Sequence, residues 1–314
     1  MDFTELRIAA VVPCHNEEAA VAKVVTDLKA AVPGIDVYVY DNLSTDATAE
    51  RAAEAGAIVR RELAKGKGNV VRRAFADIDA DVYVMIDGDD TYEAAAAPEM
   101  IAKLLDGPYD HILGVRNQID TADSAYRAGH ETGNRVLNDL VGRVFGENVQ
   151  DMLSGFRVFS RRFVKSFPAV SREFEIETEL TVHSLHLRVP QSSVEVGFRD
   201  RPAGSESKLR TYHDGFKILW LILGLARHER PVAFYGLLGG LSWLIAVILT
   251  VPIIVEFYET HLVPRFPTLF LAFTLILLGC LAWTAGLILD GIRRSRHEAA
   301  RLVYLRYSAA GKST

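Results

Sequence analysis

The chain has 314 residues, of which 49% are hydrophobic, so it can bury a substantial core and is neither disordered nor fibrous. Its net charge is -5, and both signs are mixed through the first two thirds of the sequence. No basic field therefore indicates nucleic-acid binding. The two cysteines, Cys14 and Cys280, provide neither a disulfide framework nor a metal-thiolate spacing, and they fit a reducing compartment.

Apolar runs typical of strands alternate with helical periodicities from the N-terminal end, which predicts an α/β domain with a mostly parallel sheet. The first residues lack the features of a secretory signal, so we expect this domain in the cytoplasm. The expected elements are a strand at 8–12, a helix at 17–31, a strand at 37–40, a helix at 46–55, strands at 57–59 and 82–86, helices at 70–77 and 131–145, and a strand at 193–198.

Two later segments, 231–255 and 268–289, contain no Lys, Arg, Asp or Glu. Each is long enough to cross a bilayer core of ~30 Å, so we predict two transmembrane helices, with buried helices of a soluble domain as the alternative. Arginines lie on the outer flanks of the pair, which predicts that both ends face the cytoplasm. The apolar stretch 216–226 is too short to span and is expected to be an interfacial helix, or else a core helix.

These features divide the chain into four expected parts. They are a folded domain at 1–209, a juxtamembrane interfacial helix at 210–230, a two-helix membrane anchor at 231–290 and a cytoplasmic tail at 291–314. The tail after Arg301 is expected to be a frayed end.

Three polar motifs follow expected strands at their carboxyl ends, where ligands of open α/β sheets bind: 13–17, 41–48 and 87–90. Asp87 and Asp89, one residue apart after a buried strand, suit a divalent cation such as Mg²⁺ or Mn²⁺ that keeps coordination sites for substrate phosphates. Taken alone, the motif is also explained as an Asp/Gly turn. The convergence of the three motifs favours a nucleotide site.

The first two motifs carry the candidate nucleoside-binding residues. Asp41 lies at a strand end, where a carboxylate can accept a hydrogen bond from a base imino group or a ribose hydroxyl, whereas helix capping explains Asp46 and Thr48. The polar side chains of 13–17 lie beside an expected helix N-terminus, which is a natural nucleotide-binding position. Glu17 is also explained as a first-turn charge that favours the helix dipole.

Four motifs in this order closely resemble family 2 glycosyltransferases of the GT-A fold: Pro13-x-x-Asn16-Glu17, Asp41-x-x-Ser44-x-Asp46-x-Thr48, Gly66-Lys67-Gly68 and Asp87-x-Asp89. Later segments resemble the polyprenyl-phosphate glycosyltransferases, which include dolichyl-phosphate mannose synthases and bacterial relatives: Gly114-Val115-Arg116, Ser154-Gly155-Phe156-Arg157, Phe174-Glu175-Ile176-Glu177-Thr178-Glu179 and Arg201-x-x-Gly204-x-x-Ser207-Lys208. The resemblance covers residues 7–220. Two positions depart from it, namely Asn42, where many relatives have Asp, and Thr91, where several have Gln.

The resemblance implies a GT-A nucleotide-sugar domain and assigns roles to individual positions. The nucleotide sugar would be bound by Pro13, Asn16, Glu17, Asp41, Lys67, Asp87, Gly88, Arg201 and Lys208. The metal, Mg²⁺ or Mn²⁺, would be held by Asp87 and Asp89, and the acceptor phosphate by Arg116 and Arg127. The expected catalytic set is Asp89, Arg116, Arg127 and Asp151.

We therefore expect metal-dependent, inverting transfer of a sugar from a nucleotide sugar, UDP in preference to GDP, to polyprenyl phosphate at the cytoplasmic face of the plasma membrane. A lipid phosphate is already anionic near neutral pH and needs no strong general base. One alternative is the same fold acting on a hydroxyl acceptor, with Asp151 as the base, and another is an inactive membrane scaffold. Expected partners are membrane lipids and a downstream flippase or lipid-sugar-dependent transferase. Whether the chain forms a homo-oligomer is left open by the sequence.

Overall fold

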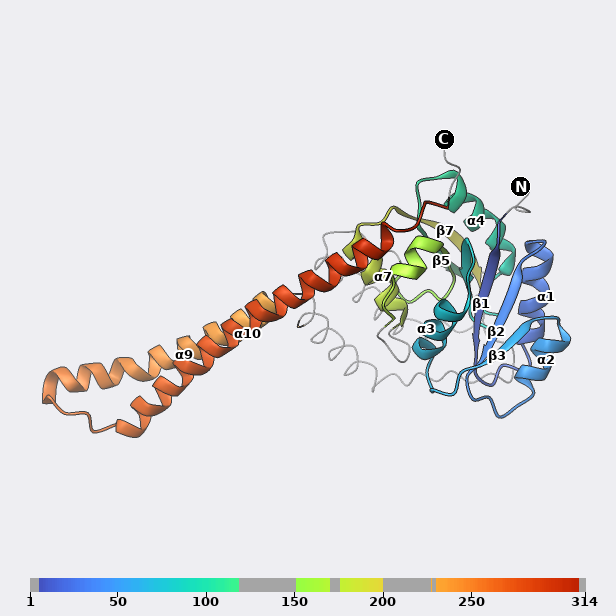
Figure 1. The fold of residues 1–314 in the computed structure, drawn as a ribbon. Coiled ribbons are helices and arrows are strands. Elements are labelled where there is room, and N and C mark those ends of the chain that lie inside the picture. The colour runs from blue at the N-terminus through green and yellow to red at the C-terminus, as the bar shows by residue number, and fades with distance from the viewer. Residues whose placement is uncertain (1–5, 119–150, 170–175, 200–226, 228–229, 311–314) are drawn as a thin grey trace. The chain divides into compact units, whose positions relative to one another are not determined.

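The computed structural model describes residues 6–118, 151–169, 176–199, 227 and 230–310 (Figure 1). These belong to two compact units, one formed by residues 1–211 with 299–314 and the other by residues 212–298. The helix expected at 131–145 and the interfacial helix expected at 216–226 lie outside the described residues.

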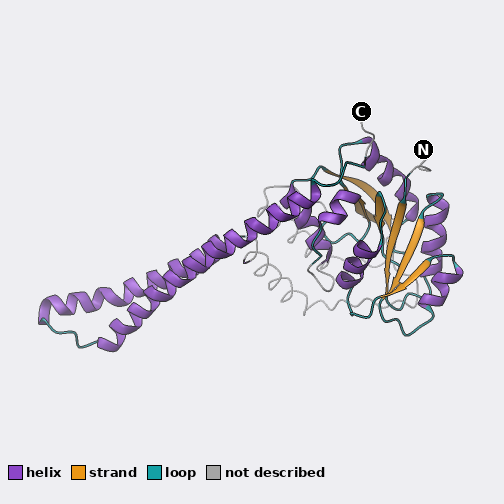
Figure 2. Ribbon diagram, in the orientation of Figure 1, coloured by secondary structure: helices purple, strands orange, loops and turns teal. Residues whose placement is uncertain are grey.

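The first unit is built on a seven-stranded sheet with the order β3-β2-β1-β4-β6-β5-β7 (Figure 2). The strands are β1 (Ile8–Cys14), β2 (Asp36–Asp41), β3 (Ile58–Arg61), β4 (Val82–Met85), β5 (His111–Gln118), β6 (Arg157–Ser160) and β7 (Gln191–Phe198). Only β6 runs antiparallel to its neighbours, β4 and β5, in this described sheet. The carboxyl ends of the parallel strands therefore meet at one edge, together with the amino end of β6.

Helices cover both faces of this sheet, as the alternation of side chains along its strands requires. The helices are α1 (Val21–Ala31), α2 (Thr48–Glu54), α3 (Lys67–Asp77), α4 (Ala97–Asp106), α6 (Arg161–Ser166) and α7 (Ile176–Leu187), with a 3-10 turn at Ala94–Ala96. Along β1, Ala10 and Val12 pack in a core with α1, α2 and α4, whereas Ala9 and Val11 pack in a second core with α3, α6 and α7. Both faces of β1 are thus buried.

The second unit contains α9 (Pro231–Thr260) and most of α10 (Phe266–Tyr304), which continues past Glu298 into the first unit. The most apolar 18-residue stretches of α9 and α10 have mean hydropathies of 2.4 and 2.2, so each helix is long and apolar enough to cross a membrane. Small residues allow the two helices to approach closely, since a Cβ at Gly239 would lie 2.9 Å from the carbonyl oxygen of Gly279. The rings of Trp243 and Trp283 stack beside this contact with centroids 6.2 Å apart.

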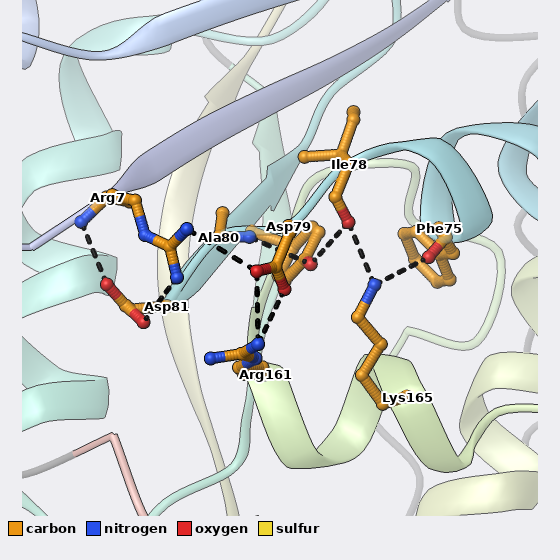
Figure 3. Close-up of polar contacts among 9 residues, drawn as sticks. Arg7, Phe75, Ile78, Asp79, Ala80, Asp81, Arg161 and Lys165 are labelled. Atoms are coloured by element: carbon orange, nitrogen blue, oxygen red, sulfur yellow. Dashed lines mark hydrogen bonds and ion pairs between the residues drawn. The ribbon is translucent and has the colours of Figure 1, made fainter.

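Charged side chains gather at the amino edge of the sheet, opposite the carboxyl ends of the strands (Figure 3). Asp79 forms ion pairs with Arg7 at 3.4 Å and Arg161 at 2.8 Å, but its side chain is 50% exposed. Such exposed pairs contribute little to stability. Lys165 instead donates to two carbonyl groups at the end of α3, at 2.8 and 3.0 Å, and so satisfies acceptors that the helix leaves open.

The last turn of α10 is part of the first unit and packs there around the buried carboxylate of Asp110, which precedes β5. Asp110 accepts hydrogen bonds from Ser160 Oγ at 2.6 Å, from two nitrogens of Arg162 at 2.5 and 2.6 Å, and from Tyr304 Oη at 2.7 Å. Tyr304 is only 6% exposed, and Arg301 donates to a backbone carbonyl at the end of α7 at 2.6 Å. The frayed end expected after Arg301 is therefore wrong for this turn, because a polar network buries it.

We expect Asp110→Asn to destabilise the first unit. The substitution leaves the guanidinium of Arg162 without its counter-charge, and breaking a buried pair costs about 3–5 kcal/mol. Since the Arg162 side chain retains 19% exposure, we expect a loss near the lower end of that range, about 3 kcal/mol. Thermal unfolding followed by near-UV circular dichroism measures it. Asp106→Asn, at the exposed end of α4, is the matched control, and equal unfolding temperatures for the two variants would contradict the assignment.

Candidate functional site

The three strand-end motifs converge at the carboxyl edge of the sheet. Cys14 at the end of β1 pairs in register with Asp41 at the end of β2. On its other side β1 pairs with β4, with Val11 opposite Met85, and the acidic turn begins two residues after Met85, at Asp87. The expected convergence of these motifs is therefore what the fold produces.

The loops after β1 and β2 are tied together by hydrogen bonds. Asn16, at a φ of 57°, donates its backbone N–H to Ser44 Oγ at 3.0 Å, and its side-chain oxygen accepts from Thr45 N at 2.8 Å. Glu17 N donates to Thr48 Oγ1 at 2.8 Å. Much of the polarity of these two motifs thus braces one loop against the other, and α1 begins at Val21 rather than at Glu17 as expected, because this bracing occupies the preceding residues.

The hydrogen bonds of Asn42 explain why this position departs from the family pattern. Its side-chain amide donates to the carbonyl oxygens of Glu62 at 3.0 Å and Ala64 at 2.8 Å, and its oxygen accepts from Gly66 N at 2.7 Å. A carboxylate has no N–H groups for the two carbonyls. Asn42 therefore fastens the segment that leads into α3. The neighbouring Asp41 is 5% exposed at the end of β2.

Asp87 and Asp89 occupy the turn after β4. The Asp87 side chain is 27% exposed, whereas Asp89 is only 4% exposed and its Oδ1 accepts from Thr91 Oγ1 at 2.6 Å. Thr91, the second departure, thus orients Asp89. Asp90 has a φ of 57° and pairs with Lys23 on α1 at 2.8 Å, so it shapes the turn and joins it to the helix.

Two glycines allow the acidic turn to lie against the chain. A Cβ at Gly155, before β6, would fall 2.3 Å from Asp87 Oδ2, and a Cβ at Gly88 would fall 2.3 Å from Cys14 Sγ. Neither distance is compatible with a side chain. Burial raises the pKa of the Cys14 thiol, so the sulfur is a neutral packing group beneath the carboxylates.

Lys67, the first residue of α3, supplies a second cation to this turn, beside Lys23. Its ammonium is hydrogen-bonded to Asp87 and to Glu177, which lies in the first turn of α7. Burial lowers the pKa of Lys67, but the two carboxylates outweigh it, and the net shift is upward. Glu177 falls in a segment that supported the family resemblance, yet it was not among the expected site residues. Only the contact between α3 and α7 reveals it.

Arg116 on β5 is held by Asp151, which lies shortly before β6. Arg116 Nε and Nη2 each donate to one oxygen of Asp151 at 2.8 Å, a bidentate pair in which the Asp151 side chain is 6% exposed. Burial lowers the pKa of Arg116, but Asp151 more than compensates and the pKa is raised. The guanidinium also lies 5.3 Å from the ring centroid of Phe198 on β7.

Arg157 supports this segment from the interior. It is completely buried and donates to the carbonyl oxygens of Ser154 at 2.9 Å and Met152 at 2.6 Å, and to Thr181 Oγ1 on α7 at 2.9 Å. Burial lowers its pKa to about 10. The sequence identified the motif around Arg157 without a role for the arginine, which the structure shows to be a brace between the segment before β6 and α7.

The carboxylates at this edge fit a hard divalent cation. Asp87 and Asp89 offer oxygen ligands, and the Gly155 backbone leaves Asp87 room to approach. Within the described ranges no group of three or more His, Cys, Asp or Glu residues forms a metal cage. Mg²⁺ and Mn²⁺ are typically held by one or two carboxylates, while water and substrate phosphates complete the shell. The expected phosphate ligands Arg127, Arg201 and Lys208 lie outside the described residues.

Comparison with known proteins agrees with this architecture. Residues 9–167 match the model of glycosyl transferase family 2. The glycosyltransferase AglJ of Haloferax volcanii is 34% identical over 236 residues, 75% of this chain and 77% of AglJ. A dolichyl-phosphate hexose transferase of the same organism is 27% identical over 229 residues, 73% of this chain and 98% of that protein. The structure of Mycobacterium tuberculosis glucosyl-3-phosphoglycerate synthase with Mn²⁺, UDP and phosphoglyceric acid matches with a TM-score of 0.56 at 22% identity, over 71% and 78% of the two chains.

The mostly parallel sheet with acidic residues after its fourth strand is the GT-A fold of glycosyltransferases, and the expected fold class is confirmed. The chain belongs to glycosyl transferase family 2, whose model matches half of its length. At 22% identity the structural likeness supports the fold alone.

Gly155→Ala tests the close approach to Asp87. The added methyl group would displace the Asp87 carboxylate, and a misplacement of about 1 Å in a reacting group costs roughly 100-fold in rate. We expect sugar transfer to fall by about that factor while circular dichroism stays unchanged. Gly291→Ala, where nothing lies within 4 Å of the added Cβ, is the control and should retain activity. Full activity of Gly155→Ala would show that Asp87 need not hold this position.

Proposed function

We propose that the protein transfers a sugar from a nucleotide diphosphate sugar, UDP-linked in preference to GDP-linked, to polyprenyl phosphate at the cytoplasmic face of the plasma membrane. Transfer occurs in a single step with inversion and gives a polyprenyl-phospho-sugar for cell-envelope or glycan modification. The observation that carries this proposal is the bidentate pair between Arg116 and Asp151. It presents a fixed guanidinium at the carboxyl edge of the sheet.

A phosphate acceptor explains why Arg116 is held in a fixed orientation at this edge of the sheet. The lipid phosphate is an anionic nucleophile, so the protein must orient it and offset its charge rather than remove a proton. A guanidinium binds two phosphate oxygens at once, and Asp151 fixes its plane. In the rival reaction with a hydroxyl acceptor, Asp151 would be the base, but both of its oxygens already accept hydrogen bonds from Arg116.

The donor side of the proposal rests on the acidic turn. Asp87 and Asp89 would hold Mg²⁺ or Mn²⁺, and the ion supplies positive charge that stabilises the departing nucleotide diphosphate. Pro13, Asn16, Glu17 and Asp41 line the neighbouring strand ends, where the nucleoside would lie, while Lys67 and Gly88 would contact the diphosphate. The fold neighbour with Mn²⁺ and UDP supports this type of donor. Outside the described residues, Arg201 and Lys208 would grip the donor phosphates and Arg127 the acceptor phosphate.

The acceptor side draws on the relatives and on the apolar helices. A dolichyl-phosphate hexose transferase is among the relatives, and α9 and α10 are long and apolar enough to keep the protein at a bilayer, where a polyprenyl chain resides. With both ends of this helical pair in the cytoplasm, the phosphate headgroup and the nucleotide sugar would meet on the same side. A flippase or a lipid-sugar-dependent transferase would then use the product.

A panel of UDP- and GDP-sugars tests the proposal. The purified full chain in detergent is incubated with either polyprenyl phosphate or polyprenol, with Mg²⁺, Mn²⁺ or EDTA, and lipid products are identified by mass. We expect one hexose added to polyprenyl phosphate, and no product with EDTA. Glycosylated polyprenol with unchanged polyprenyl phosphate would establish the hydroxyl-acceptor alternative, and no product from any combination would favour the inactive scaffold.

Asp89→Asn provides the matched test of the metal site. We expect a loss of metal-dependent turnover of roughly 100-fold or more, the scale of losing one charge contact in a transition state, with little effect on the fold. Asp90→Asn, one residue later in the same turn and directed to Lys23, should stay within severalfold of wild type. Equal turnover in the two variants would remove Asp89 from the metal site.

Asp151→Asn separates a positioning residue from a general base. If Asp151 orients Arg116, the variant should have a raised KM for polyprenyl phosphate and an unchanged pH profile. Its effect should also be non-additive with that of Arg116→Lys, because the two residues act through one contact. Loss of the acidic limb of the kcat profile, with the KM unchanged, would identify Asp151 as the base instead.

A further inference from the structure

The ammonium of Lys67 lies where a helix disfavours positive charge. Lys67 is the first residue of α3, at the end that carries the positive partial charge of the helix dipole. Its side chain is only 10% exposed, so water does not offset this cost. Two carboxylates, Asp87 and Glu177, compensate it. A lysine that is buried at this unfavourable position implies that its charge is needed there.

The contact between Lys67, Asp87 and Glu177 does not satisfy all the hydrogen-bonding groups of its two carboxylates. The Asp87 side chain remains 27% exposed, and among the described residues Glu177 Oε2 is buried without a hydrogen-bond partner. A buried acceptor without a donor is costly, and native structures usually satisfy such groups. Within this described contact, Glu177 therefore keeps one buried oxygen without a donor, and Asp87 stays partly open to solvent.

The charges around Asp87 determine whether a metal ion can bind there beside the ammonium of Lys67. Asp87, Asp89 and Glu177 carry three negative charges, and the ammonium of Lys67 offsets one of them. Because this ammonium is hydrogen-bonded to Asp87, a divalent cation that binds Asp87 must compete with it for the carboxylate and is repelled by its positive charge at close range. A nucleotide diphosphate removes the conflict, because its oxygens add negative charge and can accept hydrogen bonds from the released ammonium.

We propose that Lys67 is an internal counter-cation that competes with a divalent metal for Asp87 and so weakens metal binding in the absence of nucleotide. When the donor diphosphate binds, the ammonium pairs with the diphosphate instead, and Asp87 becomes available to the metal. Glu177 is the positioning residue that holds the ammonium in the empty state. This inference rests on the proposed function for the metal and diphosphate sites. Its consequence is coupled binding, in which nucleotide and metal strengthen each other by the same factor.

Metal binding in the absence of nucleotide tests the proposal directly. Free Mn²⁺ is measured by electron paramagnetic resonance during titration of the full chain in detergent, for wild type, Lys67→Met and Lys65→Met. We expect Lys67→Met to bind Mn²⁺ at least about tenfold more tightly than wild type, within the usual range of coupling between sites. Lys65→Met removes the same charge from an exposed position two residues earlier and should match wild type. Equal or weaker Mn²⁺ binding by Lys67→Met would overturn the proposal.

Repeating the titration with UDP and with GDP separates this proposal from the proposed function. At least one nucleotide should strengthen Mn²⁺ binding to wild type, and the gain should shrink by about tenfold in Lys67→Met. If wild type binds Mn²⁺ with nucleotide but Lys67→Met binds Mn²⁺ alone no better than wild type, only the counter-cation role fails. If neither protein binds Mn²⁺ under any condition, the metal site and this inference both fail. Lys67→Gln, which keeps a hydrogen-bond donor without the charge, gives the same comparison should Lys67→Met not fold.

Discussion

The repulsion between carboxylates at one edge of the sheet is the constraint on which the site depends. Asp87 and Glu177 share the ammonium of Lys67, and Asp151 is paired with the guanidinium of Arg116. Each acid therefore has a cation from a different element, so the ion pairs of this edge also hold β5, α3 and α7 to it. Removing any one cation would leave an uncompensated buried acid, which is more costly than losing an exposed pair.

The antiparallel strand β6 is what completes this edge. Because β6 runs against its neighbours, the segment that precedes it, from Asp151 to Phe156, arrives at the carboxyl ends of β4 and β5. There Gly155 leaves room for Asp87, and Asp151 reaches Arg116. Arg157, buried beneath, ties the same segment to α7. A fully parallel sheet would have placed these residues at the opposite edge.

The sequence predicted the parts of this arrangement that depend on local pattern. Continuous apolar runs identified β1 and β4, and the turns after them identified Asp87 and Asp89, because ligands of parallel sheets lie at such positions. It could not predict the contact of Lys67 with Glu177, since 110 residues separate them and no spacing rule relates the first turns of α3 and α7. The sequence also did not predict that the side chain of Asn16 braces a neighbouring loop, because composition does not distinguish such bracing from ligand binding.

The two edges of the sheet carry separate tasks, and the length of a strand keeps them apart. Asp110 lies just before β5 and fastens the end of α10, while Arg116 lies six residues further along the same strand, a separation of about 20 Å at ~3.3 Å per residue. Asp110 is also paired with Arg162, so little net charge acts across that distance. The charges around Asp110 therefore influence the site through the integrity of the strand rather than through its electrostatic field. A sheet of this depth can hold the last turn of α10 at one edge while the opposite edge carries the ion pairs of Asp87, Glu177 and Asp151.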